Sequence, residues 1–438
     1  MDAALLTLVL FACMMILLVI GVPVAITLGS LGFLFTLLLW GPDALYIGAA
    51  AASGQIMNYV LLAVPLFVLM GCVLERTAIA DELYEMMYMW LGPINGGLAI
   101  GTVVICAMLG AMTGITATGT VTMGLIAVPS MLKRGYHKRM AIGCVEAGGA
   151  LGVLIPPSVI MIIYALFSGE SVGRLYAGGV VPGLLLGALF VSYLGVRGIL
   201  QPHLCPAMPK EERADWRTRF AKLRNVILPV VLIVMVLGSM FAGVATATEA
   251  AAVGAFATIA AALIQRRLSW RAMKDACGTT LKLTSMVMWI LVGASIFVSA
   301  YSALGAPQLI QQMVTAWPVN RWLVMALIQL IWFVLGSLLD PIAIIMITIP
   351  VFLPVIKLLH FDPLWFGVIF VVNMEMAYLT PPFGMNLFYM KSVAPAGVTM
   401  VDIYRAIIPF VLLQAVGLVL CLAFPEIILW LPSLVYGK

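Results

Sequence analysis

The chain has 438 residues, of which 64% are hydrophobic and only 9% are charged. Soluble domains carry about 25% charged residues, so this composition excludes a water-soluble globular protein. The net charge of +5 does not imply nucleic acid, because the basic residues gather in loops on one side of the predicted membrane. Several apolar runs approach the about 20 residues that a membrane span needs. The sequence therefore predicts an all-α polytopic membrane protein.

The apolar runs, taken in chain order, predict ten spanning helices and two hairpins that do not span. Each hairpin is expected to enter and leave the membrane on the same side. The hairpins are predicted at about 94–132 and 320–356. The spans are predicted at about 4–20, 23–40, 57–75, 140–166, 174–198, 226–244, 248–265, 281–303, 364–390 and 404–424.

The distribution of Lys and Arg orients these segments, because cytoplasmic loops carry an excess of both residues. With re-entrant hairpins, 19 of the 23 basic residues fall on one side of the membrane. Treating either hairpin as a single crossing would place basic loops on both sides. We therefore expect a cytoplasmic linker at 203–225 and both termini on the outer side of the membrane.

The linker divides the chain into a first repeat at 1–202 and a second repeat at 226–438. Each repeat holds five predicted spans and one hairpin, and an odd number of spans inverts the second repeat relative to the first. Identical residues recur at an offset of 225 positions. They are Pro129 and Pro354, Leu154 and Leu379, Pro156 and Pro381, and Pro157 and Pro382.

The first hairpin is predicted to turn within residues 110–122, a stretch rich in small and hydroxyl residues. Irregular backbone at membrane depth survives only against a cavity or bound ions. Helix packing is the alternative, because small residues also line contacts between membrane helices. The residues concerned are Gly110, Thr113, Gly114, Thr116, Thr118, Gly119 and Thr120.

The second hairpin is predicted to turn within residues 336–343, where Asp340 precedes Pro341. An acidic residue near the bilayer centre costs about 2.5–3.5 kcal/mol on insertion scales and usually marks an ion or substrate path. Asp340 could instead cap the helix that begins at Pro341, and both roles could hold together.

A Pro-Pro pair breaks a long helix after each hairpin, since proline removes a backbone donor and clashes with the preceding turn. The first break follows Gly148, Gly149 and Gly152, and the second begins at Thr380. Unwound backbone frees carbonyl oxygens that suit a small alkali cation, and helix ends offer N–H groups to an anion. A kink needed only for packing is the bland alternative.

Two carboxylates, Glu146 and Glu375, lie within the helices that flank the breaks. They could bind a cation or proton, or bond to a neighbouring helix. The sequence contains no Walker, HExxH or GxSxG motif, which argues against an ATP-driven pump and against an enzyme. The seven cysteines are scattered and predict no metal site.

At these residues the chain resembles the large membrane subunit of the tripartite ATP-independent periplasmic (TRAP) transporters. The strings that carry the resemblance include LGVLIPPSVIM (151–161), LGSLLDPIAIIMITIPVFLPV (335–355) and LTPPFGMNLF (379–388). The likeness spans almost the whole chain. It departs at the first tip, which reads Gly-Ile-Thr-Ala-Thr where the family often has Ser-Gly-Ser, and at Glu146 and Glu375.

The resemblance implies an elevator-type secondary transporter driven by sodium. Two hairpin tips and two broken helices would enclose the ions, with substrate between the tips. Sodium would be held by Gly110, Gly114, Gly149, Gly152 and Pro156 at one site, and by Gly336, Asp340, Thr380 and Gly384 at the other. Substrate contacts are expected from Thr113, Thr116, Thr118, Ser158, Ser337 and Asn386.

The resemblance also implies partners: a small four-helix membrane subunit and a periplasmic substrate-binding protein that delivers a small organic anion, often a carboxylate. It also implies a bacterial inner (cytoplasmic) membrane, with both termini in the periplasm. No cofactor besides Na⁺ is expected. Two alternatives stay open. One is a cation-coupled carrier that works without a binding protein, and the other is an ion channel.

Overall fold

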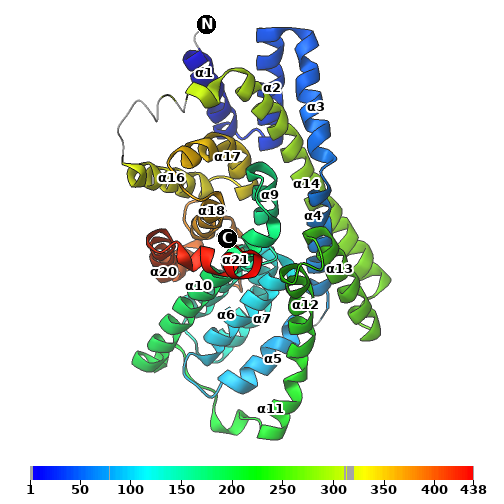
Figure 1. Ribbon diagram of the computed structural model, residues 1–438. Coiled ribbons are helices and arrows are strands. Elements are labelled where there is room, and N and C mark those ends of the chain that lie inside the picture. Colours follow the sequence, from blue (N-terminus) through cyan, green and yellow to red (C-terminus); the bar gives the residue numbers. More distant parts are fainter. Residues whose placement is uncertain (1–2, 78, 310–311, 313–319, 438) are drawn as a thin grey trace.

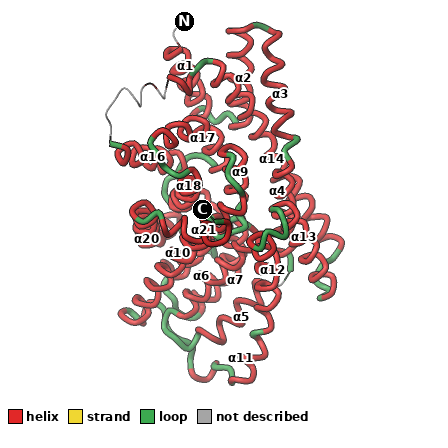
Figure 2. The backbone as a smooth tube through the Cα atoms, viewed as in Figure 1, coloured by secondary structure: helices red, strands yellow, loops and turns green. Residues whose placement is uncertain are grey.

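The computed structural model describes residues 3–77, 79–309, 312 and 320–437. Within these ranges the chain folds into helices joined by short loops, and no strand occurs (Figures 1 and 2). The prediction of an all-α protein is confirmed.

Among the described residues before the linker, the chain forms ten α-helices. Residues 94–132, predicted as a hairpin, form two adjacent helices, and the predicted helix 140–166 is divided in two. The helices are α1 (Ala3–Val19), α2 (Val24–Trp40), α3 (Leu45–Ile56), α4 (Ala63–Glu75), α5 (Ile79–Leu91), α6 (Gly97–Thr113), α7 (Thr116–Lys133), α8 (Lys138–Ala150), α9 (Val159–Ser168) and α10 (Val172–Leu200).

The remaining described helices begin in the linker with a short helix, α11 (Trp216–Lys222). The second predicted hairpin again forms two adjacent helices, and the predicted helix 364–390 is again divided. The helices are α12 (Arg224–Phe241), α13 (Ala247–Ile264), α14 (Trp270–Ala303), α16 (Arg321–Gly336), α17 (Pro341–Leu358), α18 (Pro363–Tyr378), α19 (Met385–Val393), α20 (Met400–Ala423) and α21 (Glu426–Tyr436).

Six of the described helices are long and apolar enough to cross a membrane, and a bent pair over 42–75 raises the number to at most seven. Five of the six coincide with predicted spans, and the sixth is α17, one limb of the second hairpin. The number of ten spans is therefore not confirmed by helix length. The predicted spans 4–20 and 23–40 form helices of only 17 residues, and two other predicted spans are broken.

The helix bounds recur along the chain at the same offset of 225 positions as the prolines. Residue 341, where α17 begins, lies 225 positions after residue 116, where α7 begins, and their last residues, 358 and 133, differ by the same number. The packing is reciprocal as well: α7 contacts α19 and α17 contacts α9, while α8 contacts α20 and α18 contacts α10. Two related halves would pack this way if the hairpin of each half lay against the divided helix of the other half. Their inverted orientation in a membrane stays a prediction.

The helices gather into two groups that lie side by side. Helices α2, α3, α4, α13 and α14 pack on one another along the right of Figure 1 and are called the scaffold group below. The hairpins, the divided helices, α10 and α20 form the other, which we call the core group. Helix α14 contacts α17 and α4 contacts α6, so the hairpins of the core group face the scaffold group.

The linker is held against α5 by the side chains of its short helix, α11. Trp90 of α5 packs edge-to-face on Trp216 and Phe220 of α11, and its indole N–H donates to the Arg219 carbonyl at 3.1 Å. Lys222 pairs with Glu85 at 2.6 Å. Aromatic side chains therefore give the linker a helix that its polar sequence did not indicate.

Candidate functional site

The first hairpin meets the first broken helix through pairs of glycines. A Cβ atom on Gly110 would lie 2.3 Å from the Cα of Gly152, and one on Gly119 would lie 3.3 Å from the Cα of Gly149. Side chains at these positions would push the two backbones apart. The helix-packing role of the small residues is thus realised, and it brings the tip directly onto the unwound segment.

The turn of this hairpin occupies Gly114 and Ile115, between α6 and α7. Gly114 adopts φ +67°, and a Cβ there would lie 2.4 Å from the carbonyl oxygen of Pro157. Only glycine combines this backbone conformation with so close an approach. The neighbouring Thr116 Oγ1 is buried and has no hydrogen-bond partner within the described part of the chain. An orphaned hydroxyl at this turn suits a bound ion or substrate.

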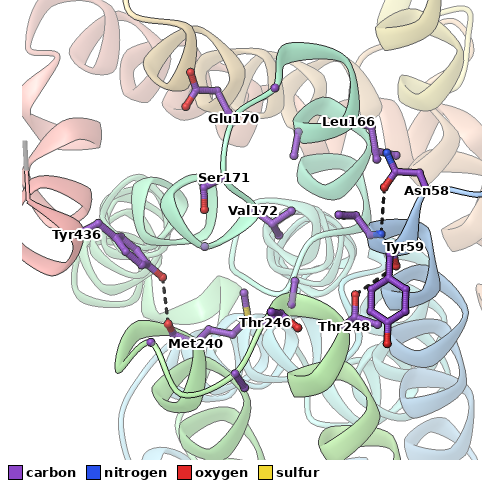
Figure 3. Close-up of a pocket in the computed structure, with 17 residues that line it drawn as sticks. Asn58, Tyr59, Leu166, Glu170, Ser171, Val172, Met240, Thr246, Thr248 and Tyr436 are labelled. Atoms are coloured by element: carbon purple, nitrogen blue, oxygen red, sulfur yellow. Dashed lines mark hydrogen bonds between the residues drawn. The ribbon is translucent and has the colours of Figure 1, made fainter. Parts of the chain in front are cut away.

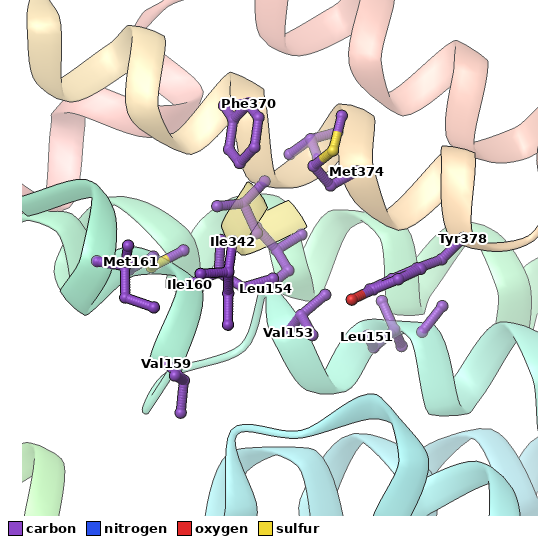
Figure 4. Packing of buried hydrophobic residues seen from close by; sticks show 14 of the residues in the cluster. Leu151, Val153, Leu154, Val159, Ile160, Met161, Ile342, Phe370, Met374 and Tyr378 are labelled. Carbon is purple, nitrogen blue, oxygen red and sulfur yellow. The ribbon is translucent and has the colours of Figure 1, made fainter. Parts of the chain in front are cut away.

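The first break separates α8 from α9 as predicted. A 3₁₀ turn at Leu151–Val153 ends the first limb, and the peptide bond between Pro156 and Pro157 is cis. Ser158 caps α9: its hydroxyl accepts the Met161 N–H at 3.4 Å and donates to the Val153 carbonyl at 2.6 Å. Figure 4 shows the apolar packing around this segment, which includes Ile160 of α9, Ile342 of the second tip and Phe370 of α18.

The second tip closes on the second divided helix in a similar way. A Cβ on Gly336 would lie 2.6 Å from the Cβ of Ala377, one turn before the break. Asp340 is the N-cap of α17, and its carboxylate accepts the Ile342 N–H at 2.9 Å. The capping role is confirmed. The hydroxyl of Tyr378 lies close enough to the Asp340 carboxylate to interact with it.

The second break differs from the first in its exposure. Pro156 and Pro157 are buried, whereas Pro381 and Pro382 are exposed and Phe383 is 56% exposed. The carbonyl of Thr380 accepts the Gly384 N–H at 3.1 Å, and the Thr380 hydroxyl donates to the Met376 carbonyl at 2.8 Å. The two breaks therefore have different surroundings although their prolines match.

A cavity of about 120 Å³ lies where both tips and both divided helices converge. The scaffold group closes one side with α4 and α14. The cavity is lined by Val64, Val68, Gly114, Ile115, Thr116, Ala117, Val153, Val159, Ile160, Leu283, Met286, Val287, Asp340, Ile342, Tyr378 and Tyr389.

The family described as "Tripartite ATP-independent periplasmic transporter, DctM component" matches residues 11–427. The chain belongs to the TRAP transporter large-subunit family.

Two relatives are similar to this TRAP subunit in sequence, and one solved structure is similar to it in fold. It is 34% identical to the C4-dicarboxylate TRAP transporter large permease protein DctM of Pseudomonas aeruginosa, over 93% of this chain and 94% of the relative. It is 31% identical to the ectoine/5-hydroxyectoine TRAP transporter large permease protein UehC of Ruegeria pomeroyi, over 98% of this chain and 99% of the relative. The Alcanivorax borkumensis YdaH transporter shares the fold, with a TM-score of 0.63 over 92% of this chain and 97% of that chain, at 15% identity.

The residues predicted to bind substrate occupy different surroundings in this TRAP subunit. Thr116 lines the cavity, whereas Thr113 and Thr118 are buried within the hairpin. Ser158 is engaged as a cap, and Ser337 donates to the Val334 carbonyl at 2.8 Å. Substrate contact by these residues stays a prediction.

Asn386, also predicted to bind substrate, ties three elements of the TRAP subunit together. Its side-chain carbonyl accepts the Thr120 hydroxyl at 2.6 Å, and its amide donates to the Glu146 carbonyl at 2.9 Å. Asn386 is completely buried. These contacts join α7, α8 and α19.

The residues predicted to hold sodium are brought together in two sets. Gly110, Gly114, Gly149 and Gly152 line the contact between the first tip and the first break, next to Pro156. Gly336 and Asp340 lie at the second tip, and Thr380 and Gly384 lie at the second break. Among the described residues no three His, Cys, Asp or Glu side chains cluster as metal ligands. The atoms that could bind an ion here are backbone carbonyl oxygens and the side-chain oxygens of Thr and Asp. Hard oxygen ligands of this kind fit an alkali cation.

The sequence did not single out the two cavity tyrosines or the scaffold side of the cavity. Tyr378 and Tyr389 both lie close to Asp340, and Met286 and Val287 come from α14. A tyrosine just before the second Pro-Pro pair was the available signal for Tyr378. No local signal distinguishes the α14 residues from other apolar span residues.

Glu146 and Glu375 lie away from the cavity lining. Both are completely buried, and within the described part of the chain their carboxylate oxygens have no hydrogen-bond partner. Gln414 of α20 lies beside Glu375. The two roles predicted for these glutamates, ion binding and contact with a neighbouring helix, both stay predictions.

A larger cavity, of about 560 Å³, opens between the α9–α10 junction and the α12–α13 junction (Figure 3). Tyr436 donates to the Met240 carbonyl at 3.2 Å across it, and Thr248 donates to the Tyr59 carbonyl at 3.4 Å. None of the predicted sodium or substrate residues lines this cavity. The convergence of tips and breaks therefore remains the candidate transport site.

Proposed function

We propose that this TRAP large subunit carries out sodium-coupled uptake of a small organic anion. The observation that supports this best is the cavity of about 120 Å³ between the two tips and the two divided helices. It lies at the boundary between the core group and the scaffold group. Movement of one group past the other would carry the cavity across the membrane, as an elevator mechanism requires.

The lining of the cavity favours an anion held without a basic side chain. Helices α7, α9 and α17 begin at Thr116, Val159 and Pro341, and all three starts lie at the cavity. Helix N-termini carry partial positive charge and free N–H groups, which stabilise an anion. Its lining includes no Lys or Arg. A carboxylate bound there would rely on these helix ends and on the Thr116 hydroxyl.

Sodium ions would complete the charge balance. The carbonyls around the first break, with the orphaned Thr116 hydroxyl nearby, form one set of hard donors. Asp340, with the backbone around Thr380 and Gly384, forms the other. Because one set contains a carboxylate and the other does not, we expect two sodium affinities.

The family name supports two partners for this chain: a periplasmic substrate-binding protein and a small membrane subunit. Reconstitution of the three proteins into liposomes tests the assignment. The organic anion is chosen by thermal shift of the binding protein, beginning with C4-dicarboxylates. Its uptake should require external sodium. Equal rates in choline and sodium media would contradict sodium coupling, and uptake that then follows a pH gradient would point to protons.

The same liposomes distinguish the alternatives. Uptake of free substrate by this chain alone would remove the tripartite assignment in favour of a stand-alone carrier. A sustained ohmic current without counterflow of unlabelled substrate would indicate a channel.

Two substitutions of Asp340 separate its charge from its capping role. Asp340→Asn keeps an acceptor for the Ile342 N–H, so stability should change little while the sodium concentration for half-maximal uptake rises. Asp340→Ala removes the cap as well and should lower the free energy of unfolding by about 0.5–2 kcal/mol. Unchanged sodium dependence in Asp340→Asn would move the site elsewhere. Thr380→Ala provides an independent check on the same site.

A further inference from the structure

A third cavity, which shares no lining residue with the two described above, lies where α5, α12 and the α13–α14 turn meet. Its volume is about 600 Å³. It is lined by Ile79, Glu82, Arg224, Asn225, Ile227, Leu228, Val231, Gln265 and Arg267. Two arginines and one glutamate give this lining an excess of positive charge.

Only part of the Arg267 guanidinium is paired within the chain. One of its Nη atoms pairs with the Glu82 carboxylate. The other Nη is buried and has no hydrogen-bond partner within the described residues. A buried, unpaired guanidinium N–H is costly, and an anion in the cavity would satisfy it.

The cavity continues into an apolar surface along α12. Ile227 is 61% exposed, Val231 is 45% exposed and Val234 is 62% exposed, and all three lie on the helix that begins at Arg224. Helix α12 is long and apolar enough to cross a membrane. An anionic head beside Arg224 and Arg267, with hydrocarbon running along α12, matches the arrangement of charge and apolar surface.

We propose that this cavity binds the phosphate headgroup of an anionic phospholipid, with Arg224 and Arg267 as its cationic ligands and the exposed face of α12 as the bed for an acyl chain. The charge distribution of the sequence places this region on the side of the membrane that carries most of the basic residues. The proposal is independent of the substrate and of the coupling ion.

Native mass spectrometry of the purified, delipidated chain, titrated with dioleoylphosphatidylglycerol, tests the site. One tightly held lipid is expected, and dioleoylphosphatidylcholine should not displace it. Arg224→Gln should weaken binding about fivefold, the effect expected of one arginine near an anionic headgroup. Arg267→Gln should do the same. Glu82→Gln, which frees Arg267 from its pair, should keep or strengthen binding.

Arg266→Gln is the matched control, because Arg266 is exposed in the same turn and does not line the cavity. Equal weakening by Arg224→Gln and Arg266→Gln would overturn the proposal in favour of diffuse attraction. Binding of inorganic phosphate with the same affinity as the lipid would overturn it in favour of a free-anion site. Unchanged lipid binding in Arg224→Gln, together with lost co-purification of the small membrane subunit, would assign the cavity to that subunit.

Discussion

At the scale of single residues, the transport site depends on positions where the absence of a side chain matters. Gly110 and Gly152 let two backbones touch, and Gly114 places the turn of the hairpin on the Pro157 carbonyl. These contacts hold the tip against the unwound segment without occupying the space that an ion or substrate needs. Several such glycines gather at this one interface, whereas other glycines of the chain have no atom within 4 Å of an added Cβ.

Gly110→Ala should separate the first tip from the first break. The new Cβ would lie 2.3 Å from the Cα of Gly152, and a backbone atom cannot move aside cheaply. Overpacking of this kind costs about 1–3 kcal/mol, so the thermal unfolding midpoint in detergent should fall and uptake should be lost. Gly278→Ala is the control, because it lies within α14 with no atom within 4 Å of the new Cβ. A stable, active Gly110→Ala protein would contradict the contact.

Asn386→Ala should destabilise the protein rather than only weaken substrate binding. It leaves the buried Thr120 hydroxyl and the Glu146 carbonyl without their partner, at about 1–3 kcal/mol in the free energy of unfolding. Thr120→Val removes the other side of one bond, so the double variant should be less destabilised than the sum of the two single variants. An increase in KM with unchanged stability would instead support the substrate role predicted for Asn386.

At the scale of elements, the two divided helices are both broken at a Pro-Pro pair, but the two breaks have different surroundings. The N-cap of α9 is Ser158, whose hydroxyl accepts a backbone N–H, whereas that of α19 is Gly384, which has no side chain to offer. The first Pro-Pro pair is buried and the second is exposed. The local sequence explains where each helix stops. The exposure of each break depends on which helices cover it, and α6 of the same half packs on the 3₁₀ turn of the first break.

The short helix α11 should detach from α5 when its aromatic contacts are removed. Trp90→Ala deletes two edge-to-face pairs, each worth about 0.5–1.5 kcal/mol beyond area burial, and the hydrogen bond to the Arg219 carbonyl. Trypsin should then cut the Arg-rich linker faster than in the unchanged protein. Trp289→Ala, an exposed tryptophan of α14, is the control and should leave the rate unchanged.

At the scale of the whole molecule, the cavity joins two groups of helices that would have to slide past each other. Met286 and Val287 belong to the scaffold group, and Ile342 belongs to the second tip. A contact that must break during each cycle is a suitable place to arrest the cycle.

A chemical cross-link between Met286→Cys and Ile342→Cys should therefore stop uptake. Each single cysteine variant, treated with the same reagent, should keep its activity, and Cys277 should be replaced first because it is exposed. Reduction of a cleavable linker should restore transport. Full activity of the cross-linked protein would argue against relative movement of the two groups.

The orientation of the molecule can be tested with the linker. Trypsin should cleave residues 203–225 in inside-out membrane vesicles and leave them intact in right-side-out vesicles, since the basic loops are predicted to be cytoplasmic. Cleavage from the outer face would reverse the predicted orientation and would move the proposed lipid cavity to the other leaflet.

The sequence by itself determined the membrane class, the two hairpins, the two breaks and the offset of 225 positions. These are local consequences of apolar length, proline chemistry and turn residues, and they need no knowledge of distant contacts. It missed α3, α5, α11 and α21, and it predicted the start of α14 eleven residues late, because short or amphipathic helices depend on packing more than on propensity.

Only the tertiary structure decided which residues share the transport cavity. Thr116, Asp340, Tyr378 and Met286 come from four separate helices or tips, and nothing in their own segments indicates that they meet. It also decided that Asn386 joins three helices, since its partners are 266 and 240 residues away. Long-range contacts of this kind arise from the reciprocal packing of the two halves, which the matching prolines indicate but do not specify in detail.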